Sequence, residues 1–181
     1  MLLHPLVLCS VIVLGSPERG IVVYLPSPQE SSVPERFRLK AETFWYELEP
    51  ALATPRYTVS LLRFPSPITT PDVENNVVHA EFFDPIGFTG RRPAVVVLHI
   101  LGSDFPLSRY MAARLADRGV AALFLKLPYY GERRPKAGPS PVPRKFLTAD
   151  IERTMTAMRQ GVCDVRRAIY WLAEGQKPVR D

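Results

Sequence analysis

The residues best placed to do chemistry form the turn from His99 to Asp104 (HILGSD), between an apolar run and a helical pattern. In open α/β sheets, ligands bind where the chain leaves the carboxyl end of a strand and turns into a helix. Two uses of such a turn are considered. Its backbone could approach the phosphates of a nucleotide, or its N–H groups could form an oxyanion hole, which stabilises the negative charge that acyl transfer places on a carbonyl oxygen.

The glycine content of the turn argues against the nucleotide. A dinucleotide fingerprint needs three spaced glycines, and a P-loop needs Gly-Lys-Ser/Thr, whereas this turn has one glycine and no lysine. Ser103 is the only serine near the turn, but it lacks the Gly-x-Ser-x-Gly context of an activated nucleophile. We interpret His99 as a residue that stabilises the turn and not as a base.

A strand, a helix and a second strand must position this turn. Residues 94–98 (AVVVL) form a continuous β-branched run, expected of a strand covered on both faces. Ser103 or Asp104 can cap the following helix, with Pro106 in its first turn. Gly119 provides the stop, and residues 120–127 (VAALFLKL) form the next buried strand, so the two strands are predicted to be parallel. The helix is expected to present one apolar face, formed by Leu107, Met111 and Leu115.

Further elements lie on both sides of this unit. Residues 57–64 and 76–83 read as two strands, predicted to pair antiparallel at a sheet edge, with His79 as a surface or core-packing residue and not a catalytic one. Residues 1–56 are expected to be an N-terminal extension wrapping the domain formed by 57–181. A long helix is predicted over 146–174, and its apolar residues alternate steps of four and three. The simpler interpretation of this seam is that the helix packs on a sheet, and the alternative is a coiled coil. The seam comprises Leu147, Ile151, Met155, Met158, Val162, Val165, Ile169 and Leu172.

The composition of the chain limits the classes of partner that it is expected to bind. The net charge is +5, but much of the excess lies in the proline-rich loop 128–144, with no interleaved aromatic pattern, so no nucleic-acid partner is expected. Two cysteines and three scattered histidines give no disulfide framework and no metal spacing, so no metal and no cofactor are expected. The apolar run 6–15 is too short for a stable membrane span. It suits a signal segment covering residues 1–16, a misplaced start or a buried N-terminal segment, so the location stays open.

Residues from about Tyr57 to Asp181 resemble the N-terminal half of α/β-hydrolases of the dienelactone hydrolase and acetyl xylan esterase kind. The resemblance rests on VVVLHILGSD, SRYMAARLADRGVAALFLKLPYYGER, and DVRRAIYWLAE ahead of PVRD. It implies an α/β fold with a partial α/β-hydrolase sheet in three layers, in which an antiparallel strand pair precedes a parallel β-α-β unit and a long helix.

The resemblance also implies roles for site residues. The backbone N–H of Leu101, or of its neighbour Ile100, looks like the first oxyanion-hole donor, although Ile100 stands where the family usually has glycine. Tyr129, Tyr130 and Arg133 look like loop residues that contact substrate near the pocket. The alternative is that Glu132 and Arg133 brace the loop.

The function that follows is the hydrolysis of a small carboxylic ester by a serine-type hydrolase, of which this chain is an N-terminal fragment. The nucleophile, acid and histidine, which follow in that chain order in the family, have no counterpart here, so the chain alone is expected to be inactive. A non-catalytic binding or scaffold protein derived from the same fold is the alternative. If further strands normally pair beside residues 94–98, that strand is an exposed apolar edge, and self-association is expected.

Overall fold

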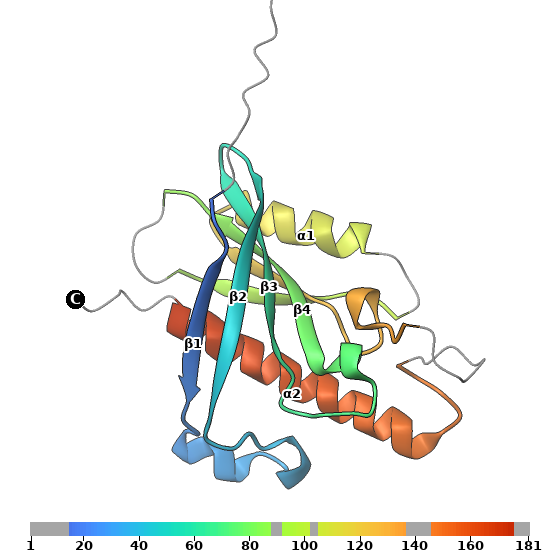
Figure 1. Cartoon of the computed structure of the whole chain (residues 1–181). Helices are drawn as coiled ribbons and strands as arrows, with labels where there is room; N and C mark the ends of the chain where they lie inside the picture. Colours follow the sequence, from blue (N-terminus) through green and yellow to red (C-terminus); the bar gives the residue numbers. More distant parts are fainter. Residues whose placement is uncertain (1–14, 88–91, 102–104, 137–145, 176–181) are drawn as a thin grey trace, which may run out of the picture.

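The computed structural model describes residues 15–87, 92–101, 105–136 and 146–175. These residues form a six-stranded mixed sheet with a helix on each face, an arrangement of three layers (Figure 1). The strand order is β1-β2-β3-β4-β6-β5. The elements are β1 (Glu18–Tyr24), β2 (Glu42–Ala53), β3 (Tyr57–Pro65), β4 (Val77–Pro85), β5 (Ala94–Leu98), α1 (Pro106–Ala116), β6 (Ala121–Leu125) and α2 (Ile151–Gly175), with 3-10 turns η1 (Pro28–Ser32), η2 (Glu35–Phe37), η3 (Val73–Asn76) and η4 (Gly131–Arg133).

The expected α/β architecture is confirmed. β3 and β4 pair antiparallel, β5 and β6 pair parallel, and α1 connects the parallel strands. Successive side chains of β6 point to opposite faces of the sheet. Ala122 and Phe124 pack toward α1, whereas Leu123 and Leu125 join the core beneath α2, as the two-residue period of a strand requires.

The N-terminal region differs from expectation. Residues 18–24 and 42–53 are strands of the same sheet rather than an extension wrapped around it, so β3 and β4 lie inside the sheet and not at its edge. Val22, Tyr24 and Phe44 are buried in the core cluster that also contains Trp171 of α2. These two strands are packed because their alternate side chains meet a helix more than 100 positions later in the sequence, which local periodicity does not reveal.

The β5 strand is the other edge of the sheet. Among the described strands it pairs with β6 alone, and Val95 and Leu98 remain about two-fifths exposed (41% and 45%). The expectation of a strand covered on both faces is therefore wrong for the residues that the structure describes. Gly119 takes φ 83°, the left-handed conformation that ends the α1 segment as predicted.

The α1 helix buries a different face from the expected one. Leu107 and Met111 are more than half exposed, and the buried residues are Ser108, Ala112 and Ala116. Of the expected apolar face, Leu115 alone packs against the core. The small side chains face the sheet because the bulky groups at that contact come from the strands, chiefly Phe124. Small side chains at this contact let the helix approach the sheet closely.

The α2 helix shows the same difference on a larger scale. Most of the apolar seam predicted to pack on the sheet faces solvent, and only Val165 and Leu172 of its members are covered. The buried stripe is instead partly polar; it comprises Ala157, Gln160, Gly161, Cys163, Asp164, Arg167, Ala168, Trp171 and Leu172. Within the described ranges, no helix is both long and apolar enough to cross a bilayer.

Candidate functional site

The turn that follows β5 is anchored by a buried histidine. The backbone N–H of Leu127, after β6, donates to Nε2 of His99 at 3.1 Å, and Nδ1 of His99 lies 3.0 Å from the carbonyl oxygen of Ile100. Because Nε2 accepts a hydrogen bond, the proton of the neutral ring is on Nδ1, from which it donates to Ile100. Burial also lowers the pKa of His99. His99 therefore stabilises the turn, in agreement with the sequence interpretation.

Aromatic rings enclose the His99 side chain. The ring centroids of Tyr130, Phe105 and Phe124 lie 4.3, 5.1 and 6.4 Å from that of His99. Phe105 precedes α1, Phe124 belongs to β6, and Tyr130 lies in the loop after β6. The turn is consequently held from three sides, and its backbone geometry is coupled to the packing of α1 on the sheet.

The two predicted oxyanion donors lie at the surface of this anchored turn. Ile100 is 60% exposed and Leu101 is 49% exposed. Neither backbone N–H has an acceptor among the described residues. Backbone N–H groups that are not used by the fold are the kind of donor that can stabilise an oxyanion. Ser103 and Asp104 lie outside the described residues, and the prediction that one of them caps the helix is wrong, because the N-cap position of α1 is Phe105, which makes no side-chain capping hydrogen bond.

The loop after β6 brings the two predicted tyrosines close to the turn. Tyr130 packs on His99, as above. Tyr129 is buried and has φ 67°, a left-handed conformation that is unusual for a side chain of its size. Its N–H donates to Oδ1 of Asn75 at 3.0 Å, and the guanidinium of Arg153 lies 4.9 Å from its ring centroid. The strained backbone is held in place by these contacts, and Tyr130 is the tyrosine that lines the turn.

Arg133 does not face the turn. Its side chain is fully buried, and it donates to the carbonyl oxygens of Lys126 and Asn75. Its Nη1 also lies 2.8 Å from Oδ2 of Asp164 on α2. The geometry of that contact is an ion pair and not an aligned hydrogen bond, since Oδ2 has no hydrogen-bond donor. A substrate cannot reach this guanidinium in the observed conformation, so the geometry fits the bracing role.

A buried polar network, not anticipated from the sequence, surrounds that ion pair. Asn75 Nδ2 donates to Oε1 of Gln160 at 2.7 Å, and Gln160 Nε2 donates to the carbonyl oxygens of Ile68 and Asn75. Ser66 donates to Oδ1 of Asp164 at 2.6 Å. Burial raises the pKa of Asp164, an effect that the Arg133 charge opposes. The network joins η3, the loop after β6 and α2, and it fixes the loop that supports the turn.

Charged residues form a second cluster beside Phe105. Lys126 is buried, and its Nζ lies 2.7 Å from Oε1 of Glu132 and 3.4 Å from Oε1 of Glu81. Arg109 of α1 binds both carboxylate oxygens of Glu81. The cluster links α1 to β4 and to the end of β6. Burial is the largest single effect on the pKa of Glu132 and raises it, but hydrogen bonds and nearby charges, led by those of Lys126, together lower the pKa below its usual value.

Acid is expected to destabilise the fold through His79. Burial is the main cause that lowers the pKa of His79 to about 4. The charges of Lys126, Arg133 and Arg63 lower it further, and that of Glu132 opposes them. A histidine with a lowered pKa binds a proton more readily when unfolded, so its stabilisation is complete above pH 6.5 and is lost as the pH falls toward 4. After allowance for solvent screening, we expect the loss to be about 1–2 kcal/mol between pH 7 and pH 4.

Urea unfolding of the wild type and of His79→Gln at both pH values measures this contribution. The variant should lose less free energy of unfolding than the wild type over that interval. Equal losses in the two proteins would show that His79 is not responsible.

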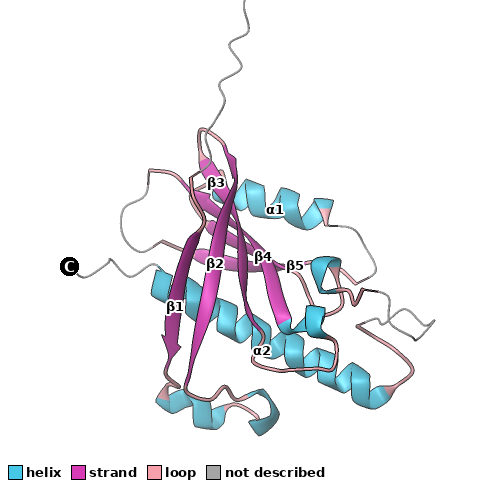
Figure 2. Cartoon of the chain, viewed as in Figure 1, coloured by secondary structure: helices cyan, strands magenta, loops and turns pink. Residues whose placement is uncertain are grey.

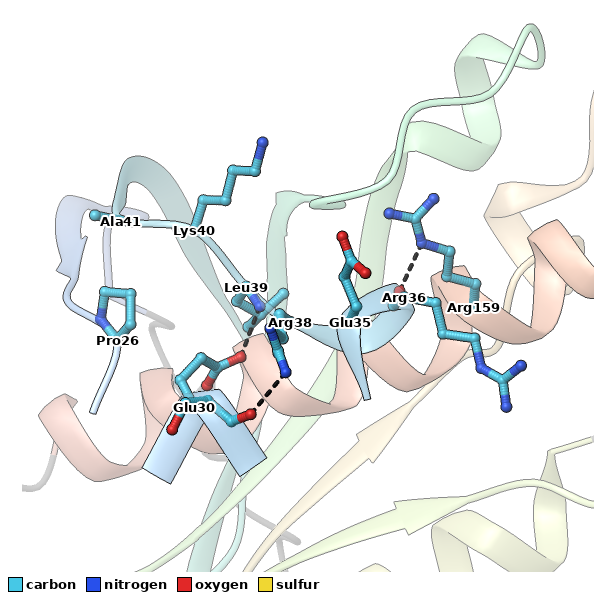
Figure 3. Close-up of a pocket in the computed structure, with 10 residues that line it drawn as sticks. Pro26, Glu30, Glu35, Arg36, Arg38, Leu39, Lys40, Ala41 and Arg159 are labelled. Carbon is cyan, nitrogen blue, oxygen red and sulfur yellow. Dashed lines mark hydrogen bonds between the residues drawn. The ribbon is translucent and has the colours of Figure 1, made fainter. Parts of the chain in front are cut away.

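The surface also carries a depression of about 790 Å³ beside η1, η2 and α2 (Figure 3). Two of the arginines that line it, Arg38 and Arg159, donate hydrogen bonds to backbone carbonyl oxygens. Arg38 donates to the carbonyl oxygen of Ser31, and Arg159 donates to that of Arg36. Glu30 accepts from the N–H of Leu39 in the same place. These groups brace the η1–η2 segment against α2, and none of the predicted site residues lines the depression.

Comparisons with known proteins support the fold. No protein-family model matches the sequence, and no curated protein shows significant sequence similarity to it. Among solved structures, the acetyl xylan esterase from Paenibacillus sp. R4 is similar with a TM-score of 0.52 and 17% identity, over 72% of this chain and 42% of that chain. At this identity the likeness concerns the fold. The chain therefore has a partial, esterase-like α/β fold, and it spans less than half of the esterase that it resembles.

Proposed function

We propose that this chain, with β1 and β2 as part of its sheet, forms the N-terminal half of a carboxylic-ester hydrolase domain and supplies the first oxyanion-hole donor. The observation that carries the proposal is the turn after β5, where the hydrogen bonds of His99 anchor Ile100 and Leu101 at the carboxyl end of a parallel strand, and where neither N–H has an acceptor among the described residues. The fold likeness to an acetyl xylan esterase supports an ester as the substrate class.

In the proposed mechanism, a serine outside this sequence, activated by a histidine, attacks the ester carbonyl. The N–H of Leu101 donates to the oxygen that becomes negative, and Tyr130 forms part of the pocket wall beside it. Arg133 and the Asn75 network hold the loop under the turn without touching the substrate. No metal or cofactor enters this scheme. Residues 1–181 alone are expected to bind ester weakly and to turn none over.

Two enzyme assays test the proposal. Purified chain 1–181 should not hydrolyse p-nitrophenyl acetate or react with a fluorophosphonate probe. The longer polypeptide, read in frame beyond codon 181, should do both, with the probe on a serine in a Gly-x-Ser-x-Gly sequence. A stop codon after Asp181 combined with a stable, inactive, monodisperse chain would instead favour the scaffold protein.

Substitution of the donor tests its role in the active polypeptide. Leu101→Pro removes that N–H and should lower kcat about 100-fold, the effect of losing one oxyanion donor. Ile100→Pro is the matched control and should have a much smaller effect. If the two variants behave in the opposite way, Ile100 is the donor, and if neither changes kcat, the turn is not an oxyanion hole.

A further inference from the structure

The α2 helix leaves an apolar stripe exposed that neither the fold nor the proposed site uses. Its five side chains are 41–75% exposed: Ile151, Met155, Met158, Val162 and Ile169. They share one face of the helix and follow it for about 27 Å. Val165 and Leu172, beside this face, pack in or against the core and are not part of the stripe. Scattered apolar residues are ordinary on a protein surface, whereas a contiguous patch marks a site that meets a protein or a membrane.

The segment from η1 to η2 lies along one flank of α2, where Arg166 pairs with Glu30 (Figure 1). Ile169 of the stripe lines a depression of about 370 Å³ on this flank. The larger depression, of about 790 Å³, shares Glu30 and Leu39 with it as lining residues. The stripe and the larger depression are therefore adjoining parts of one surface.

This surface carries basic side chains whose charge is not neutralised within the described part of the chain. Four of them line the larger depression, are exposed and form no ion pair there: Arg36, Arg38, Lys40 and Arg159 (Figure 3). Two of the four donate to backbone carbonyl oxygens, which carry no net charge. Glu30 is already paired with Arg166. The carboxylates left beside the four cations are Glu35, which lines the depression, and Glu152, in the first turn of α2. Four cations against two carboxylates leave this surface positively charged.

An apolar stripe bordered by basic residues is typical of a helix that lies at the surface of a bilayer containing anionic lipids. The apolar side chains enter the boundary between headgroups and acyl chains, while the cations meet the negative charges of the headgroups. We propose that α2 and the η1–η2 segment dock this protein on the surface of an anionic bilayer, with α2 in the plane of the membrane. A second copy of the chain fits the surface less well, because it would bring the same excess of positive charge to the contact.

The docking surface is separate from the proposed hydrolase site. The η1 turn follows β1, which is the edge of the sheet opposite β5. Strands that pair beside β5 extend the sheet away from β1, so they leave the η1–η2 flank of α2 open. No residue of the β5 turn takes part, and docking therefore does not depend on the hydrolase function.

Co-sedimentation with lipid vesicles tests this docking. The wild type should bind vesicles of phosphatidylcholine with about 30% phosphatidylserine at least about tenfold more tightly than vesicles of phosphatidylcholine alone. Met158→Glu places a charge within the stripe and should weaken binding to the anionic vesicles about 30-fold. Its circular dichroism spectrum and Tm should match those of the wild type, because Met158 is 46% exposed. Met111→Glu is the matched control. It makes the same substitution at a position of α1 that is 52% exposed, on the opposite face of the sheet, and should bind as the wild type does.

A second pair of variants tests the basic residues. Arg36→Gln/Lys40→Gln removes two cations whose side chains donate no hydrogen bond within the described ranges. Each cation near an anionic surface strengthens binding about fivefold, so the double variant should bind the anionic vesicles about 25-fold more weakly. Its binding to phosphatidylcholine vesicles should not change, and added salt should weaken its binding less than that of the wild type. Arg114→Gln/Arg118→Gln removes the same charge from α1 and the turn after it, and should leave binding within about twofold of the wild type.

Four results would overturn the proposal. The first is a wild type that binds neither kind of vesicle, and the second is equal binding to neutral and anionic vesicles. The third is binding that Met158→Glu leaves unchanged, which would assign it to the apolar run 6–15. The fourth is self-association in the absence of lipid that Met158→Glu abolishes, which would assign the stripe to a second copy of the chain.

Discussion

Asp164→Ala should lower the free energy of unfolding by about 3–5 kcal/mol, the cost of removing one partner from a buried ion pair. Arg133 and Asp164 are both fully buried, and their charged groups are 2.8 Å apart. Without the carboxylate, the guanidinium keeps only carbonyl oxygens as partners, and Ser66 loses its acceptor. Replacement of the pair as a whole is expected to cost less than the loss of one member, because no charge is then left uncompensated.

Urea unfolding of single and double variants measures this coupling. Arg133→Met/Asp164→Ala should be more stable than the sum of the two single effects predicts, by at least about 1 kcal/mol. Glu152→Ala, which removes an exposed carboxylate from the first turn of the same helix, is the control and should change stability by no more than about 0.5 kcal/mol. Additive single effects would show that the two side chains do not stabilise each other.

Phe124→Ala should also lower the free energy of unfolding by about 3–5 kcal/mol, the range for truncating a buried aromatic side chain. Phe124 is fully buried on the α1 face of β6, where its ring contacts those of Phe105 and His99. The resulting cavity removes one wall of the His99 enclosure. The hydrogen bond from Leu127 to His99 is expected to weaken with it, so the amide proton of Leu127 should exchange faster in the variant.

Two further variants separate cavity formation from a general effect of losing an aromatic ring. Phe124→Leu keeps most of the volume and should cost no more than about 1.5 kcal/mol. Tyr110→Ala removes an aromatic ring that is 63% exposed on α1 and should cost about 0.5 kcal/mol or less. If Phe124→Ala destabilises the protein but leaves the exchange of Leu127 unchanged, the turn does not depend on this packing.

The sequence by itself determined the elements around the turn. The β-branched run at residues 94–98, Pro106 in the first turn of α1, and Gly119 after its end are local signals, and the structure has a strand, a helix and a left-handed glycine at those places. The antiparallel pairing of β3 with β4 followed from two short alternating runs joined by a proline-rich loop. Such features are predictable because backbone conformation is set by residues within a few positions of one another.

Only the tertiary structure decided which faces are buried. Periodicity identified the apolar stripes of α1 and α2, but the sheet covers Ala112 and Asp164 and leaves Met111 and Val162 exposed. The buried polar side chains are stable there because partners arrive from distant positions, as Ser66 does for Asp164 across 98 residues. Arg133 braces its loop for the same reason, because its partners Asn75 and Asp164 are distant from it in the sequence. A sequence states which side chains are apolar or charged, but the free energy of burying each one depends on the atoms that the folded chain places beside it.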